Sequence, residues 1–196
     1  MRGLSEHYVE AVAAIDAANA ADPSAVTVRG DTLPLALAHG RLATAWVERL
    51  VPGADDALRL AARAHHLRRW EVPRSSYPEG KAGYHQWKRD QRARHGRDVG
   101  ALLLAAGYDD ATVGRVQALV RRDDLRTDAG AQAVEDAACL VFLETQLAAV
   151  TPAFDHAHLV DVLRKTAKKM SAAGLAAVAD VPLGNAERAL LAEALA

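Results

Sequence analysis

Alanine- and leucine-rich stretches with polar residues at helical spacing are the feature that most constrains how this chain folds. Residues 127–150 are an example, because small and branched-chain apolar residues dominate them, and alanine and leucine favour helix over strand. β-branched residues never form the alternating runs that are typical of strands. About half of the 196 residues are apolar (51%), which is enough to bury a core. The sequence therefore predicts an all-α fold.

Glycine, proline and aspartate divide the chain into helical segments. Residues 20–31 contain Asp22-Pro23 and Gly30 and are interpreted as a connection that ends the first helix. Residues 71–84 hold two prolines and two glycines, and a loop of this length in a helical domain is often functional. We expect one domain over 1–196, in which C-terminal helices at 155–195 pack on a core of about 33–148. The expected core helices are 33–50, from Asp55 or Asp56 to near Trp70, 84–106 with Gly107 as C-cap, a short helix from Asp109 or Asp110, and 127–150.

The overall charge and the cysteine content narrow the classes of function. The formal net charge is −1, so nothing draws the whole chain to nucleic acid or anionic lipid. Cys139 is the only cysteine and lies among apolar residues, which predicts a packed thiol, no internal disulfide and a reducing compartment. No run approaches the roughly 18 apolar residues of a membrane span, and acidic residues interrupt the N-terminal segment, unlike a signal peptide. We therefore expect a cytoplasmic protein without membrane association.

Two adjacent histidines, His65 and His66, lie in a segment that otherwise has the pattern of a buried helix. Neighbouring helix positions point about 100° apart, so the pair can share one ion only with further ligands from other helices. His39 and Asp136 lie in two such helices among apolar residues, where a carboxylate is costly to bury unless it is paired or bound to a cation. These residues predict a metal site of His39, His65, His66 and Asp136. The alternative is that the two adjacent histidines are ordinary helix residues, one buried and one at the surface.

The order of these residues resembles the HD metal-dependent phosphohydrolase superfamily. His39, His65 and Asp136 match three of its four ligand positions, whereas His66 stands where the superfamily has aspartate. The segments SSYPEGKAGYHQWKRDQRARHG and VEDAACLVFLE are together similar to the domain-of-unknown-function family 4202, a divergent relative of that superfamily. This resemblance covers most of the chain and implies a single HD-domain-like helical bundle.

The histidine content of the predicted site determines which ion it suits. Three imidazoles and one carboxylate leave a divalent ion with a net charge of about +1, which favours the binding of anions. Such a donor set suits Zn, Fe, Ni, Co or Mn better than Mg. Water bound to such an ion can ionise near neutral pH. Glu135 is interpreted either as a general base or as a group that orients a ligand imidazole, and the alternative is a surface carboxylate paired with an arginine.

Basic residues concentrate between 63 and 97, although the chain as a whole is nearly neutral. Residues three or four positions apart share a helix face, and arginine suits bidentate contacts to phosphate or carboxylate. By the resemblance, His85 and His95 are extra ligands or substrate contacts. The predicted substrate contacts are Lys81, Tyr84, His85, Lys88, Arg89, Arg92 and Arg69, and the predicted catalytic side chains are Glu135, His95 and Lys88. The alternative for any one of them is a solvated helix face with local ion pairs.

The sequence therefore predicts a metal-dependent hydrolase of HD type that acts on a small phosphorylated or nucleotide-like anion. Within the enzyme class, an imidazole-rich site also suits a non-haem iron oxygenase. Replacement of the paired aspartate by His66 favours another function, a catalytically weak or inactive HD-like binding module for an anionic ligand or a protein partner. No nucleic-acid-binding motif accompanies the basic residues, which argues against nucleic acid. Alanine-rich helices such as 171–179 suit packing within the monomer or against a second copy, so a homodimer stays open.

Overall fold

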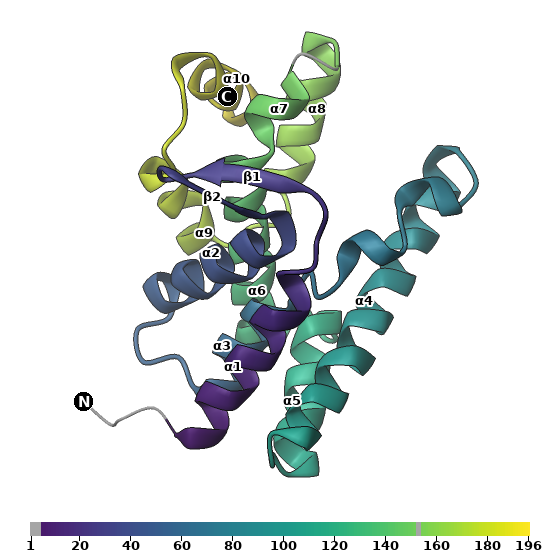
Figure 1. Ribbon diagram of the computed structural model, residues 1–196. Helices are drawn as coiled ribbons and strands as arrows, with labels where there is room; N and C mark the ends of the chain where they lie inside the picture. The colour runs from purple at the N-terminus through teal and green to yellow at the C-terminus, as the bar shows by residue number, and fades with distance from the viewer. Residues whose placement is uncertain (1–4, 152–153) are drawn as a thin grey trace.

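The computed structural model describes residues 5–151 and 154–196, which are mostly helical apart from one short hairpin (Figure 1). The all-α prediction is confirmed. Within these two ranges, no helix is both long enough and apolar enough to cross a membrane. The elements are α1 (Glu6–Asn19), β1 (Ala25–Val28), β2 (Asp31–Pro34), α2 (Leu35–Leu50), α3 (Asp56–Ala64), η1 (Arg69–Glu71), η2 (Arg74–Ser76), α4 (Gly80–Ala105), α5 (Asp110–Arg121), α6 (Ala129–Thr145), α7 (Leu147–Val150), α8 (His156–Ala167), α9 (Ala172–Ala177), η4 (Val178–Asp180) and α10 (Asn185–Leu195).

Helix α6 is central to the core, because α2, α3, α5, α7 and α9 all pack on it. Trp46, Leu60 and Leu140 are among the large side chains that are completely enclosed there. Cys139 is a buried free thiol in the same helix, and burial raises its pKa to about 12, as expected for a packed and unreactive cysteine. Helices α4 and α5 pack against each other along one flank, and the N-terminal end of α4 stands out from the bundle (Figure 1).

A β-hairpin stands where the sequence indicated only a connection. Strands β1 and β2 pair antiparallel, and the two turn residues, Arg29 and Gly30, have φ values of 52° and 92°. Positive φ at both positions matches the twist of a two-residue hairpin. The hydroxyls of Thr27 and Thr32 bond across the strands at 2.8 Å, and Arg29 pairs with Glu144 of α6 at 2.7 Å. Four residues per strand are too few for the alternation on which strand prediction relies, so the sequence did not reveal the hairpin.

Most helix ends lie where the sequence indicated. Asp55 and Asp109 cap α3 and α5, since each side chain accepts the N–H of the residue three positions further on. Gly107 follows α4 with a φ of 84°, the left-handed conformation typical of that position. Helix α4 begins at Gly80 rather than near Tyr84, so the preceding connection is shorter than expected and contains η1 and η2.

The largest difference lies at the end of α3, which stops at Ala64 instead of continuing to the predicted end near residue 70. His65 and His66 lie in the turn that follows. Arg68 has a φ of 51° and a ψ of 35°, a left-handed conformation that costs a non-glycine residue about 1–2 kcal/mol. The buried side chain of Asn19, at the end of α1, accepts the Arg68 N–H at 3.0 Å. The histidine pair therefore lies at a chain reversal that α1 helps to hold.

Asp136 fastens the C-terminal helices to α6. Its carboxylate accepts the backbone N–H of Ser171 at 2.9 Å, the Ser171 hydroxyl at 2.5 Å and the Gln132 amide at 2.9 Å. Ser171 in turn caps α9 by accepting the N–H of Gly174. A Cβ at Gly174 would lie 2.6 Å from Cγ of Asp136, so only glycine permits this approach of α9 to α6.

We expect Asn19→Ala to lower the free energy of unfolding by about 1–3 kcal/mol, because it leaves the Arg68 N–H without its acceptor. Urea denaturation followed by circular dichroism measures the change. Arg68→Gly is the matched control at the same turn, and it should be at least as stable as the wild type because glycine adopts positive φ without strain. Unchanged stability of Asn19→Ala together with a loss in Arg68→Gly would show that the Arg68 side chain, rather than Asn19, holds the turn.

Candidate metal centre and adjoining basic cleft

Four histidine rings meet at the turn after α3, and we call them the imidazole cluster. His39 comes from α2, His65 and His66 follow α3, and His95 comes from α4. The rings of His65 and His66 stack with centroids 4.1 Å apart, and the rings of His39 and His95 lie 5.2 Å and 6.3 Å from that of His66. The structure thus brings together three of the predicted metal ligands and one predicted catalytic residue, His95.

His39 is oriented by residues at the end of α6. Its Nε2 lies 3.1 Å from Oγ1 of Thr145, whose hydroxyl already donates its proton to the Val141 carbonyl. Because this oxygen can then only accept, Nε2 carries the proton and the neutral ring keeps its lone pair on Nδ1. The Gln146 amide, 3.3 Å from Nε2, accepts the same proton when its oxygen is turned towards the ring. The Nδ1 lone pair faces Nδ1 of His66 at 3.0 Å, close to the spacing of two nitrogens that each bind one metal at about 2.0–2.1 Å.

His65 and His95 carry ring nitrogens without partners. Nδ1 of His65 donates to the Ala62 carbonyl at 2.9 Å, which leaves the lone pair on Nε2. Among the described residues, that Nε2 and both ring nitrogens of His95 are buried without a well-formed hydrogen bond. A ring held by a carbonyl, with its second nitrogen free, is the usual arrangement of a metal-binding histidine. Each unsatisfied buried polar group costs about 1–3 kcal/mol, so a ligand that satisfies these nitrogens is favoured.

Burial keeps the imidazole cluster uncharged. Burial lowers the pKa of His39 to about 4 and lowers the pKa values of the other three rings well below the ordinary 6.5. The positive charges of Arg69 and Arg122 act in the same direction on rings of the cluster. All four rings are therefore neutral at pH 7, the form in which imidazole binds a metal.

Asp136, the fourth predicted ligand, lies apart from the histidines. Its carboxylate is bonded to Gln132 and Ser171, and Asp136 precedes Thr145, the α6 residue that contacts His39, by about 14 Å at 1.5 Å of rise per residue. Within the ranges that the structure describes, no three His, Cys, Asp or Glu side chains converge, as they lie, on one point where they could hold a metal ion. The structure therefore brings the predicted histidine ligands together without the predicted carboxylate.

Glu135 is held between two arginines. Its Oε2 accepts from Arg92 and from Arg122, each at 2.9 Å, and Arg122 is itself buried. Burial tends to raise the pKa of Glu135, but the charges of Arg122 and Arg92 outweigh it and hold this pKa below its ordinary value. The sequence left open that Glu135 pairs with an arginine at the surface. The structure shows the pairing, but Glu135 is buried. A carboxylate held in this way is a weak proton acceptor, and it orients Arg92.

The N-terminal half of α4 lines an open cleft of about 300 Å³, which we call the basic cleft. Its lining residues are His85, Lys88, Arg89 and Arg92, all of them predicted substrate contacts. Burial, together with the charges of Lys169 and Arg92, lowers the pKa of Lys88 to about 8. Burial is the larger cause, and the repulsion by Lys169 and Arg92 adds to it, because nearby like charges disfavour the charged form of a lysine.

The other predicted contacts differ in their positions. Tyr84 is 43% exposed, and the Lys88 ammonium lies 5.4 Å from the centre of its ring. Lys81 is exposed in the first turn of α4 and is not one of the residues that line the basic cleft. Arg69 stacks its guanidinium on Trp87, with Cζ 4.4 Å from the ring centre, and burial lowers its pKa to about 10.

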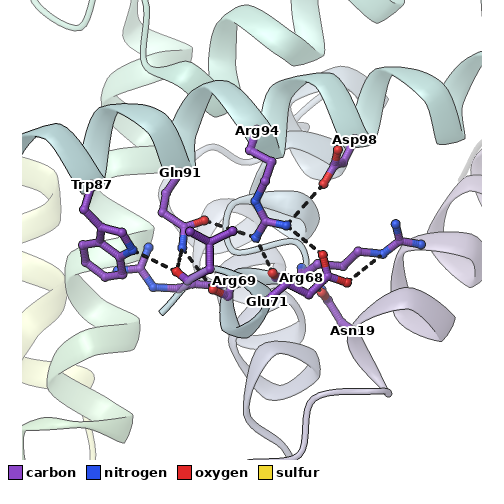
Figure 2. A network of polar contacts seen from close by, with 9 residues as sticks. Asn19, Arg68, Arg69, Glu71, Trp87, Gln91, Arg94 and Asp98 are labelled. Carbon is purple, nitrogen blue, oxygen red and sulfur yellow. Dashed lines mark hydrogen bonds and ion pairs between the residues drawn. The ribbon is translucent and has the colours of Figure 1, made fainter. Parts of the chain in front are cut away.

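A polar network that the sequence did not reveal fixes the segment of Arg69 to α4 (Figure 2). The buried Gln91 donates to the carbonyls of Arg69 and Val72, at 3.0 and 2.6 Å, and Trp87 donates its ring N–H to the Val72 carbonyl at 2.9 Å. Gln91 stands four residues from both Trp87 and His95, so the three share one helix face. That spacing is the signal in the sequence that places Gln91 beside the site.

Arg94 extends the same network to the turn after the histidine pair. Its guanidinium donates to the carbonyl of Arg68 and pairs with Glu71 at 2.8 Å (Figure 2). The contact with the Arg68 carbonyl could not be predicted from the sequence, because every residue carries a backbone carbonyl. The turn is thus tied to α4 as well as to α1.

The fold and this site define a helical protein with a buried imidazole cluster beside a basic cleft. Residues 9–191 match the family described as "Domain of unknown function (DUF4202)", and the chain belongs to this family. The predicted membership is confirmed, whereas the kinship with HD phosphohydrolases stays a prediction. No curated protein and no solved structure matches the chain.

We expect Asp136→Ala to lower the free energy of unfolding by roughly 2–5 kcal/mol, because it removes a buried, charged acceptor from the partly buried donors of Ser171 and Gln132. Chemical denaturation measures the change. Asp161→Ala, which removes a half-exposed carboxylate that pairs with Lys165 on α8, is the control and should change stability by less than about 1 kcal/mol. Bound metal should persist in Asp136→Ala, and loss of metal at unchanged stability would instead identify Asp136 as a ligand.

Proposed function

We propose that this protein is a transition-metal-dependent hydrolase that acts on a small phosphorylated anion. One observation carries the proposal. His39 and His65 each donate one ring N–H to an oxygen and keep the lone pair on the other nitrogen. Imidazoles that are neutral and oriented in this way need no deprotonation to bind a metal. The basic cleft supports an anionic substrate.

In this proposal, His39, His65 and His66 are ligands, and His95 takes the place that the sequence assigned to Asp136. The uncharged nitrogen donors fit Zn, Fe, Ni, Co or Mn, and they do not fit Mg, which prefers oxygen. Because no three rings of the described chain converge as they lie, binding requires the side chains to rotate towards a common point. When bound, such an ion supplies a Lewis acid for the phosphoryl group and activates water.

The chain's own cations bind and orient the substrate in this proposal. Arg92 reaches the basic cleft in an orientation fixed by Glu135, and Lys88 lines the same cleft. Arg69 connects the cleft to the imidazole cluster, because its charge acts on Arg92 and also lowers the pKa of His39. Fixed cations at this position stabilise the charge of a phosphoryl group without reorganisation.

A specific observation favours a second function, the binding of an anionic ligand without turnover. No carboxylate of the described residues forms a hydrogen bond with the imidazole cluster, and Glu135 is already bonded to two arginines. A site without a free carboxylate has no evident general base beyond its histidines. This is the binding-module function that His66, in the place of aspartate, suggested from the sequence.

Protein purified without an affinity tag or added metal should contain about one transition-metal ion per chain, measured by elemental mass spectrometry. His65→Ala should weaken metal binding by at least about tenfold, because it removes an oriented donor. His156→Ala removes an exposed histidine that pairs with Glu193, far along the chain from the cluster, and should leave the metal content unchanged. A wild type without metal would contradict the proposal.

Turnover separates the two functions. The metal-loaded wild type, His65→Ala and His156→Ala are assayed with a panel of phosphomonoesters and nucleotides. Phosphate release that is lost in His65→Ala and kept in His156→Ala supports the hydrolase. Stoichiometric metal without turnover across the panel supports the binding module instead.

A further inference from the structure

We infer that Arg69 and the basic cleft form one site for an anion with two or more linked phosphoryl groups, in which Arg69 anchors the end next to the imidazole cluster. This inference rests on the proposed function and narrows its substrate from small phosphorylated anions to diphosphates and triphosphates. Its basis is a cation without an acceptor beside a cleft with an excess of positive charge.

The Arg69 guanidinium is only partly exposed and lacks an acceptor. Within the described residues its side chain forms neither a hydrogen bond nor an ion pair, and its guanidinium rests on the face of Trp87. The Arg69 backbone is fixed, because its carbonyl accepts from Gln91 and its N–H donates to the His66 carbonyl at 3.1 Å. A guanidinium has five N–H donors in a rigid fork, so one that is held in place favours a carboxylate or phosphate oxyanion.

Arg122 shows how the same chain stabilises a buried guanidinium that serves the fold. Burial lowers the pKa of Arg122 to about 10, as it does for Arg69. However, Arg122 donates to the Glu135 carboxylate at 2.9 Å and to the Val120 carbonyl at 2.7 Å. Arg69 has neither kind of partner in the described chain. The contrast indicates that the acceptor of Arg69 comes from outside the fold.

The basic cleft holds more positive charge than the nearby carboxylates offset. Glu135 acts on Lys88, but it is already shared between Arg92 and Arg122. The lowered pKa of Lys88 reflects burial first and then repulsion from Lys169 and Arg92. A phosphate monoester carries about −1.5 to −2 charges at pH 7, and a second linked phosphoryl group adds to that charge. A diphosphate therefore balances the cleft and Arg69 better than a monoester does.

Isothermal titration calorimetry with inorganic pyrophosphate and orthophosphate tests this inference at constant ionic strength. The full chain is used with EDTA present, so the result does not depend on bound metal. We expect pyrophosphate to bind at least about tenfold more tightly than orthophosphate, and Arg69→Gln to weaken pyrophosphate binding by at least about tenfold. Equal affinities of the wild type for the two anions would overturn the inference.

Arg97→Gln is the matched control, because Arg97 is an exposed arginine of the same helix α4 that does not line the cleft. It makes the same change in net charge and should weaken pyrophosphate binding by less than about twofold. Equal effects of Arg69→Gln and Arg97→Gln would reduce the binding to general charge and overturn the inference. Arg69→Lys, which keeps the charge and loses the fork, should bind with intermediate affinity, and it decides the matter if Arg69→Gln does not fold.

Lys88 gives the site a pH dependence that can be tested separately. Its pKa of about 8 means that its positive charge is lost as the pH rises from 7 to 9, so pyrophosphate affinity should fall over this range. The charged groups that act on it are Lys169, Arg92, Glu135 and Arg69, and the centre of the Tyr84 ring lies 5.4 Å from its ammonium. Lys88→Arg keeps a positive charge that does not titrate between pH 7 and 9, so it should remove most of the fall in pyrophosphate affinity. If Lys88→Arg shows the same pH profile as the wild type, Lys88 is not part of the site.

Failure of this inference and failure of the proposed function give different results. A wild type that holds metal and releases phosphate from monoesters, but does not bind pyrophosphate, refutes the diphosphate site and leaves the hydrolase standing. Pyrophosphate binding that depends on Arg69, together with an absence of metal from the protein as purified without EDTA, supports the site and refutes the hydrolase.

Discussion

Desolvation of the imidazole cluster is the constraint on which the rest of the site depends. Burial keeps all four rings neutral, so His65 and His66 can stack at 4.1 Å without mutual repulsion and their lone pairs stay available. The chain achieves this burial by ending α3 just before the pair and by holding the reversal at Arg68 with Asn19 and Arg94. A loose turn would admit water, and the rings would regain their ordinary affinity for protons.

Charge is divided between two neighbouring regions of the site. The imidazole cluster is neutral, and the basic cleft and Arg69 are positive. Glu135 is the carboxylate that connects them, because it binds Arg92 at the cleft and Arg122 in the interior. Because the Glu135 carboxylate is already bonded to two arginines, it would not neutralise a metal ion among the rings. An anion bound in the basic cleft would have to balance that charge. Cation and anion binding would then strengthen each other.

Local signals allowed the sequence to predict the helices and their caps, such as Asp109, whereas partners distant along the chain could not be predicted. The apolar neighbours of Asp136 correctly indicated a buried carboxylate, but its acceptor role towards Ser171 depends on how α9 returns to α6. The order of the histidines indicated their meeting, and the structure brings them together. The role of Thr145 in orienting His39 had no signal in the sequence, because a threonine at a helix end is a common residue.

The contact between Gly174 and Asp136 has a consequence for how the family can vary. A side chain at position 174 would overlap a carboxylate that three hydrogen bonds hold in place, so the carboxylate could not turn aside without losing them. We therefore expect positions 174 and 136 to vary together. A homologue with alanine or a larger residue at position 174 should carry a residue shorter than aspartate at position 136. Homologues in which only one of the two positions is substituted should be rare.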